Sequence, residues 1–415
     1  MAIWPRLASR LAVHDPRRPI GPDDLFPDDP AHPIPRIVRF LGTDGSPRIG
    51  VVRVSVQGLP RHVIDLTGRH GLGPGLLDFI GAGGLELAER ALEHDAAGGA
   101  ARDDVTLAPE DLPARLLSPI DIDAAQIERG ERLIVGFGLT FRSHSAEAGG
   151  ARPFVFPKPT VPSGAYAPVA AGLDGDRPAA LLDYELELGC VALRDVDLDR
   201  LDHVDAAADF GYLVVNDVTT REPILRRRRT GYTQAKARPT YLPCGPWLVA
   251  GKHFTRDAPA LRRMVLTVTE TTPHADHQPH TLRQNARLED LTLGLQELLA
   301  ILSAKRSLTM PGVDGRRWPI SVTRGGRPIL PAGSLLLTGT PGGTAIRAPG
   351  RADRIRLALR SVRYLRWPSE DYRRHLADRR HAFGFLSPGD RVSGWITGLG
   401  RQEWEVRPGG ADAVA

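Results

Sequence analysis

Short runs rich in apolar and β-branched residues, separated by Gly, Pro and Asp, predict a chain dominated by β-strands. The expected strands cover residues 36–41, 48–56, 62–66, 132–136, 181–192, 212–216, 264–270, 334–338 and 391–397. Helical spacing of leucines is clearest over residues 286–303, and a shorter helical pattern spans residues 86–93. The pattern therefore favours an α+β fold in which strands predominate.

The pattern also divides the chain into unequal parts. Residues 1–35 are rich in Pro, Asp and Arg and predict an extended arm, whereas residues 36–125 combine strand-like runs with one helical run and predict a small N-terminal β/α module. Residues 126–415 hold most of the expected strands and predict a larger domain. Within that domain, residues from about 346 to 384 form an Arg-rich, partly helical insertion.

Composition places the chain among ordinary globular proteins. Its 415 residues are 41% hydrophobic and 25% charged, with a formal net charge of +5. The basic residues are almost all arginines, because lysine occurs only at positions 158, 236, 252 and 305. No recognisable reader motif accompanies this basic excess, so we expect no nucleic-acid partner.

Cysteine content and hydropathy indicate a cytoplasmic protein. Cys190 and Cys244 are the only cysteines, which is no disulfide framework and is typical of a reducing compartment. The first residues contain no apolar segment of signal-peptide length, and no run approaches the ~20 apolar residues of a membrane-spanning helix. We therefore expect neither secretion nor a membrane partner.

Carboxylates at two places indicate a metal site. Glu185 and Glu187 alternate with leucines in the expected strand 181–192, so they share one face and repel each other unless a base or cation intervenes. A solvent-exposed strand face is the alternative interpretation. Asp217 ends the next strand-like run and adds a third carboxylate. Without His or Cys at zinc spacing nearby, such a set favours Mg²⁺ or Mn²⁺, with Ca²⁺ also possible.

Seven segments, in order, resemble the fumarylacetoacetate hydrolase family. They are residues 134–147, with a Gly-x-Gly turn followed by His144 and Glu147, and residues 156–159, 183–187, 216–221, 235–247, 337–343 and 388–390. The resemblance covers residues from about 130 to 406, and residues 36–120 also resemble the family's N-terminal module. It implies a catalytic domain of the family's mixed β-sheet type over residues 126–415.

The resemblance and the chemistry of the side chains together suggest roles. Glu185, Glu187 and Asp217 are the expected metal ligands, and His144, oriented by Glu147, is the expected general base. An exposed polar turn is the alternative for the His–Glu pair.

Three further residues are candidates for contacts with the substrate. Lys236 is expected to hold a substrate or leaving-group oxygen, because a compact ammonium in a pocket is not replaced by arginine. Lys158 is a weaker candidate for substrate binding by the same argument. Thr340 is a candidate through its hydroxyl or its backbone N–H, and turn formation is its alternative role.

The family resemblance implies a metal-dependent hydrolase that cleaves a carbon–carbon bond in a small β-dicarbonyl acid, an acylpyruvate or a fumarylacetoacetate-like compound. Water activated by His144 would attack the carbonyl while the cation stabilises the developing enolate. Two alternatives stay open: decarboxylation or isomerisation of an unsaturated 2-oxo diacid in aromatic catabolism, and a non-catalytic scaffold of the same fold.

The resemblance also favours a homodimer that acts on a small-molecule oxo acid. The stretch between Gly343 and Pro388 is longer than is usual in the family. This insertion would either cap the active site or build a subunit contact.

Overall fold

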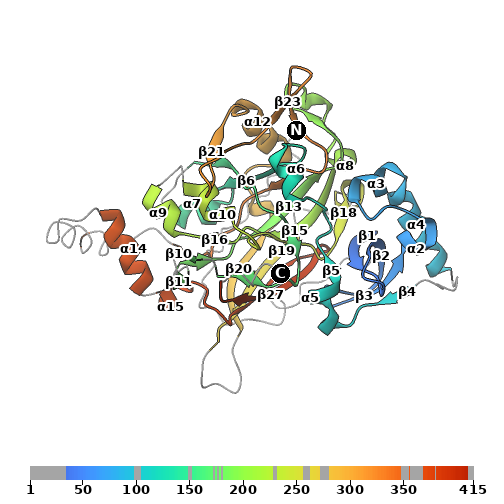
Figure 1. Cartoon of the computed structure of the whole chain (residues 1–415), viewed down its shortest axis with the longest axis horizontal. Coiled ribbons are helices and arrows are strands. Elements are labelled where there is room, and N and C mark those ends of the chain that lie inside the picture. The colour runs from blue at the N-terminus through green and yellow to red at the C-terminus, as the bar shows by residue number, and fades with distance from the viewer. Residues whose placement is uncertain are drawn as a thin grey trace.

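The fold is a strand-rich assembly with a small module on one side and helix α14 (Pro368–Asp378) of the Arg-rich segment on the other (Figure 1). This computed structural model describes residues 34–97, 104–147, 152–171, 173–174, 177–178, 181–227, 231–255, 262–271, 280–346, 355, 368–378 and 380–409. The predicted arm lies almost entirely outside the described residues, and so does the middle of the insertion.

A thirteen-stranded sheet joins both parts of the chain, and ten of its strands follow one another in the order β4-β3-β2-β1-β18-β15-β13-β25-β6-β7. These strands are β1 (Arg36–Leu41), β2 (Pro47–Val56), β3 (Leu59–Asp65), β4 (Asp104–Thr106), β6 (Ile134–Gly138), β7 (Phe154–Pro157), β13 (Leu186–Ala192), β15 (Phe210–Asn216), β18 (Leu248–Ala250) and β25 (Leu335–Leu337). Strand β1 of the predicted N-terminal module pairs with β18 of the predicted larger domain, so one sheet spans both parts of the chain. The domain boundary near residue 125 therefore stays a prediction.

Shorter strands and a second sheet complete the β-structure. The second sheet has the order β20 (His280–Arg287), β19 (Arg263–Thr269), β26 (Arg391–Ile396), β27 (Gly400–Arg407) and β9 (Val169–Ala170). The remaining strands are β5 (Leu116–Leu117), β8 (Ser163–Gly164), β10 (Leu173–Asp174), β11 (Arg177–Pro178), β12 (Leu182–Asp183), β14 (Val196–Asp197), β16 (Thr219–Thr220), β17 (Pro243–Cys244), β21 (Thr309–Pro311), β22 (Arg317–Pro319), β23 (Val322–Arg324) and β24 (Arg327–Leu330). Parallel pairs such as β25–β6 occur beside antiparallel ones, so the sheet is mixed, as predicted.

Helices cover the sheets and connect their strands. The longer helices are α4 (Gly84–Ala96), α12 (Leu295–Ala304) and α14 (Pro368–Asp378). The shorter ones are α2 (Leu66–His70), α3 (Leu76–Gly81), α5 (Leu112–Arg115), α6 (Ala124–Glu128), α7 (Arg142–Glu147), α8 (Ala206–Asp209), α9 (Glu222–Arg227), α10 (Tyr232–Lys236), α11 (Gly251–Phe254) and α15 (Arg380–Phe383). Among the described residues, no helix has both the length and the apolar character needed to cross a membrane.

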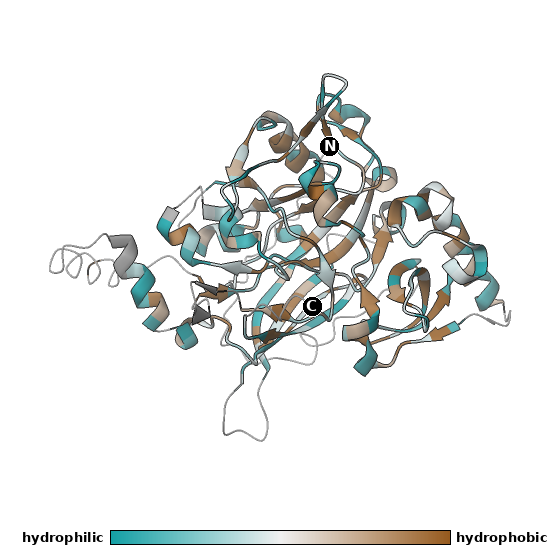
Figure 2. Ribbon diagram, viewed as in Figure 1, coloured by the Kyte–Doolittle hydropathy of each residue, from teal (hydrophilic) through white to brown (hydrophobic). Residues whose placement is uncertain are grey.

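Strands β13 and β15 form the centre of the molecule, and every residue of both is buried. Alternate residues of β13 enter two hydrophobic clusters: Leu186 and Leu188 belong to one, and Val191 belongs to the other. In Figure 2 much of the ribbon of the central strands has the colour of hydrophobic residues. Burial on both faces explains why these strands read as nearly continuous apolar runs.

The predicted helix over residues 286–303 is wrong in its first half. Strand β20 continues to Arg287, a 3₁₀ turn spans Leu288–Asp290, and α12 begins only after the N-cap residue Gly294, whose backbone is extended. Leu288 and Leu291 are nevertheless buried. Their spacing therefore reflects burial and not helix formation.

Removing one leucine of α12 tests whether this helix is part of the core. Leu299 is fully buried, so Leu299→Ala is expected to lower the free energy of unfolding by about 2–5 kcal/mol through lost burial and a residual cavity. Val313→Ala is the control, because that valine is 62% exposed. Chemical denaturation measures both; equal midpoints for the two variants would contradict the packing described here.

Candidate active site

Three carboxylates converge where β13 and β15 lie side by side. The antiparallel register pairs Leu186 with Asn216, and the Asp217 N–H donates to the Glu185 carbonyl at 2.8 Å. The side-chain oxygens of Glu185, Glu187 and Asp217, here called the acidic cluster, lie within 4.8 Å of one another. All three side chains are buried, which excludes the solvent-exposed strand face considered as an alternative.

Two lysines bind the acidic cluster from different sides. Lys236 Nζ donates to Glu185 Oε2 and to Asp217 Oδ2, both at 2.6 Å, and to Thr219 Oγ1 at 2.8 Å. Lys158 Nζ donates to the other Asp217 oxygen at 2.6 Å and to the Tyr241 carbonyl at 2.8 Å. Lys158 has no exposed surface, so its ammonium lies behind Asp217.

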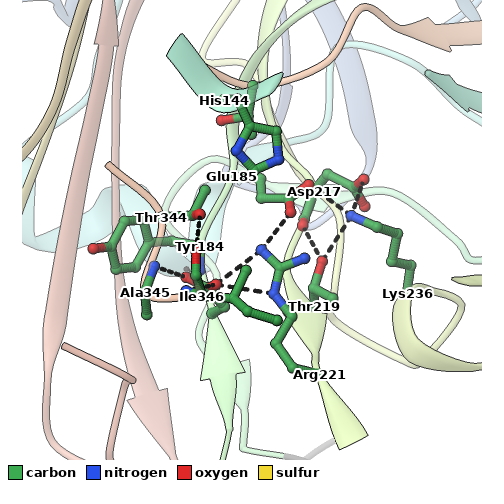
Figure 3. A network of polar contacts seen from close by, with 12 residues as sticks. His144, Tyr184, Glu185, Asp217, Thr219, Arg221, Lys236, Thr344, Ala345 and Ile346 are labelled. Carbon is green, nitrogen blue, oxygen red and sulfur yellow. Dashed lines mark hydrogen bonds and ion pairs between the residues drawn. The ribbon is translucent and has the colours of Figure 1, made fainter. Parts of the chain in front are cut away.

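Arg221 and Asp183 are site residues to which the sequence analysis gave no role. Arg221 Nη2 donates to Glu185 Oε1 at 2.5 Å (Figure 3). Its Nε donates to Asp183 Oδ2 at 2.9 Å. Asp183 also accepts the backbone N–H groups of Ala345 and Ile346. Both residues stand in segments that resemble the family, but spacing along the chain could not reveal partners so distant in sequence.

Opposite charges set the protonation of most of these groups. Burial would raise the pKa of Glu185, but the positive charges of Arg221 and Lys236 outweigh it and lower that pKa to about 2. Burial lowers the pKa of Lys236, but the Asp217 and Glu185 carboxylates more than compensate, so its pKa rises. Lys158 differs, because burial lowers its pKa and Asp217 offsets this only in part.

Among the carboxylates of the acidic cluster, Glu187 is the one whose negative charge is least stabilised by neighbouring cations. Burial first, and then the negative charges of Asp217 and Glu185, raise the pKa of Glu187 well above its usual value. The Gly339 N–H donates to its Oε2 at 2.7 Å. Glu187 therefore retains a proton to a higher pH than an ordinary glutamate unless a cation replaces that proton.

The acidic cluster fits a hard divalent cation. Its donors are carboxylate oxygens within 4.8 Å of one another. Oxygens on opposite sides of an ion are about 4.2 Å apart for Mg²⁺ and up to about 5.2 Å apart for Ca²⁺, so small side-chain movements suffice to close the set around either ion. An added cation would also offset the negative charge that, together with burial, raises the pKa of Glu187.

Helix α7 carries the predicted His–Glu pair to the cavity. His144 Nδ1 lies 3.6 Å from Glu147 Oε2, and Glu147 accepts the Gly343 N–H at 3.0 Å. Ser143 Oγ accepts the Gly342 N–H at 2.9 Å, so two backbone groups attach α7 to the 339–343 loop. In Figure 3 the His144 ring faces Glu185 from above. The structure thus brings the pair to the acidic cluster, and its role as a base stays a prediction.

Thr340 uses its hydroxyl within the protein. Its Oγ1 donates to the Leu186 carbonyl at 3.0 Å and accepts from Gln284 Nε2 at 2.8 Å. Its backbone N–H has no acceptor among the residues that the structure describes. Any contact between Thr340 and a substrate is therefore expected through the backbone N–H.

A cavity of about 270 Å³ is bordered by many of these groups, although Asp217 is not part of its lining. It is lined by Phe137, Gly138, Leu139, His144, Glu147, Phe154, Phe156, Glu185, Glu187, Arg221, Ile224, Tyr232, Lys236, Thr340, Ile346 and Tyr372. Lys158 is absent from this lining, whereas Tyr372 comes from α14 of the Arg-rich insertion. On α14, Leu376 packs into a cluster with Leu181 and Ala345, which supports a place for the insertion beside the site.

Comparison with known proteins gives a family match over most of the chain. Residues 133–407 match the family described as fumarylacetoacetate (FAA) hydrolase, C-terminal. A protein of Burkholderia lata, provisionally named a hydrolase, is 33% identical over 220 residues, which are 50% of this chain and 70% of the relative. A Burkholderia cenocepacia protein with the same kind of name is 32% identical over 217 residues, again 50% of this chain and 70% of the relative.

Solved structures share the fold at low sequence identity. A fumarylacetoacetate hydrolase from Exiguobacterium antarcticum aligns with a TM-score of 0.53 and 21% identity, covering 90% of this chain and 100% of that one. A 2-hydroxyhepta-2,4-diene-1,7-dioate isomerase from Mycobacterium marinum aligns with a TM-score of 0.51 and 20% identity, covering 91% and 99%. Proteins with this fold thus bear the names of both hydrolases and isomerases.

The protonation of Glu187 gives a prediction about metal uptake. A cation must displace the Glu187 proton, so Mn²⁺ affinity is expected to rise with pH and Mn²⁺ uptake to release a proton. Calorimetry in buffers of different ionisation enthalpy measures both effects. Glu187→Gln is expected to bind Mn²⁺ more weakly and to release no proton. Glu131→Gln, an exposed substitution, should behave as the unsubstituted protein does.

Affinity that does not vary with pH, or uptake without proton release, would contradict the environment described for Glu187.

Proposed function

Because the chain belongs to the fumarylacetoacetate hydrolase family, we propose that it is a metal-dependent hydrolase that cleaves a carbon–carbon bond in a small β-dicarbonyl acid, an acylpyruvate or a fumarylacetoacetate-like compound. One observation carries this proposal. A His–Glu pair borders the same cavity as Glu185 and Glu187, which with the buried Asp217 form a carboxylate set that fits a divalent cation.

Glu185, Glu187 and Asp217 would hold Mg²⁺ or Mn²⁺, with Ca²⁺ possible. When bound, the ion supplies Lewis-acid stabilisation to the two oxygens of a 2-oxo acid. Arg221 and Lys158 each hold one ligand carboxylate by a charged hydrogen bond, at 2.5 Å to Glu185 and 2.6 Å to Asp217. Lys158 thus supports the proposal as a positioning residue and not by contact with the substrate, because it lies outside the cavity lining.

His144 would start the reaction by taking a proton from water. Its Nδ1 lies 3.6 Å from Glu147 Oε2, beyond hydrogen-bond distance, so Nε2 would accept this proton and the nearby Glu147 carboxylate would stabilise the resulting imidazolium. The hydroxide adds to the acyl carbonyl remote from the substrate carboxylate. The carbon–carbon bond then breaks, the acyl group is released as a carboxylic acid, and the pyruvate carbanion takes up the proton that His144 removed from water, which restores the neutral imidazole.

Lys236 and Thr340 would act on the oxo acid itself. The Lys236 ammonium stays protonated between Glu185 and Asp217, so it offsets negative charge that develops on the leaving fragment. The Thr340 backbone N–H is available to donate to a substrate carboxylate. The Lys236 contact concerns charge that grows during the reaction, which is where fixed donors accelerate a step most, whereas the Thr340 contact would bind an oxygen that is charged throughout.

Decarboxylation and isomerisation are less well supported by the His–Glu pair. Neither reaction needs a base that activates water, because isomerisation needs only proton transfer and decarboxylation only a stabilised enolate. The homodimer and the cytoplasmic location stay predictions.

Substitution of the base tests the proposal. His144→Asn is expected to lower kcat for acetylpyruvate about 10²–10⁴-fold, because the water loses its general base, while Mn²⁺ binding by calorimetry persists. Glu147→Gln should give a smaller loss, since the ring remains but is less well oriented. His203→Asn, at an exposed histidine, is the matched control.

Loss of substrate absorbance measures turnover with Mg²⁺ or Mn²⁺. Unchanged kcat in His144→Asn would overturn the assignment of His144 as the general base. An unsubstituted protein that binds Mn²⁺ but turns over no acylpyruvate would favour the scaffold.

A further inference from the structure

The two ends of the cavity differ in chemistry. At the inner end, the cations Arg221 and Lys236 both already bind Glu185, at 2.5 and 2.6 Å. The rest of the lining is mostly apolar or aromatic and includes Phe154, Phe156, Tyr232, Ile224 and Tyr372. Among the described lining residues, no lysine or arginine other than those two is present.

Three of these residues form an aromatic wall, defined here as Phe154, Phe156 and Tyr232. Strand pairing places Phe156 opposite Gly136 and Phe154 opposite Gly138. A Cβ on either glycine would come within 2.3 Å of the opposite ring, so the missing side chains allow both rings to lie against β6. Tyr232 of α10 lies over them, with its ring centroid 4.3 Å from Phe154 and 5.9 Å from Phe156.

The aromatic wall begins at the acidic cluster and extends away from it. Lys236 Nζ, which contacts Glu185 and Asp217, lies 5.2 Å from the centre of the Phe156 ring. Phe156 is buried, whereas Phe154 and Tyr232 are half-buried. A substrate held at the acidic cluster would therefore direct its far end along these rings.

We propose that the aromatic wall binds an apolar acyl substituent, so that the preferred substrates are aryl- or alkyl-substituted oxo acids and not oxo diacids. The inference rests on the proposed function and specifies its substrate class. A second carboxylate at the outer end would lose its water, and both cations of the described lining are already paired. An aromatic ring there gains burial and offset contacts with three rings.

The Arg-rich insertion takes part in this selection. Tyr372 of α14 and Ile346 border the cavity with Ile224 of α9, and Tyr372 packs against the cluster that contains Leu376. The outer wall is thus built partly by a segment that the sequence analysis found longer than is usual in the family. Substrate preference is therefore expected to respond to Tyr372→Ala as well as to changes in the aromatic wall.

Turnover tests the preference directly. With Mn²⁺, kcat/KM for benzoylpyruvate is expected to exceed that for succinylpyruvate about 100-fold, the discrimination that an apolar pocket of this kind achieves. Phe154→Ala should reduce the ratio mainly through a higher KM for benzoylpyruvate. Ile224→Arg, which adds a cation at the outer end, should shift the preference toward succinylpyruvate. Val313→Ala is the exposed control, and thermal midpoints establish that each variant is folded.

Binding tests the same preference without turnover. Calorimetry on the Mn²⁺-loaded protein compares phenylpyruvate with 2-oxoglutarate, two 2-oxo acids that differ in the far substituent. Tighter phenylpyruvate binding with no hydrolysis of any acylpyruvate would support the wall and overturn the hydrolase proposal. Hydrolysis with equal or higher kcat/KM for succinylpyruvate would overturn the proposed binding role of the aromatic wall but not the hydrolase proposal. No binding of either acid would also overturn it.

Discussion

The pairing of β13 with β15 forces Glu185, Glu187 and Asp217 into one buried space, and their mutual repulsion has to be offset there. Buried charges are costly unless they are paired and hydrogen-bonded, and removing one partner of such a pair costs about 3–5 kcal/mol. Lys236 and Lys158 bind the two oxygens of Asp217 from separate sides. Two of the four lysines of the chain therefore bind the single buried carboxylate of Asp217.

Charge balance within this centre leaves a place for a cation. Asp183, Glu185, Glu187 and Asp217 carry four formal negative charges, whereas Lys158, Arg221 and Lys236 carry three positive ones. Burial first, and then the negative charges of Asp217 and Glu185, raise the pKa of Glu187. A site that is short of positive charge and rich in carboxylate oxygen is suited to a hard divalent ion.

One loop orients several parts of the site through its backbone. Residues 339–346 donate N–H groups from Gly339 to Glu187, from Gly343 to Glu147, and from Ala345 and Ile346 to Asp183. Gly339 and Gly343 have φ values of 93° and 101°, a region that residues with a Cβ rarely adopt. The same loop leads into the Arg-rich insertion. The insertion, which borders the outer end of the cavity through Tyr372, therefore follows directly after the backbone groups that hold Glu147 and Glu187.

The sequence by itself determined the features that depend on neighbours in the chain. Residues 36–41 form a strand as their apolar pattern predicted, and the alternation of Glu185 and Glu187 with leucines indicated a shared face. Tertiary structure alone decided that Lys158 is hidden behind Asp217, that Arg221 links Glu185 to Asp183, and that Tyr372 borders the cavity. It also decided that Leu288 is buried outside any α-helix. Periodicity records which side of a segment is buried, whereas partners distant in the chain are selected by strand register and packing, which no local spacing encodes.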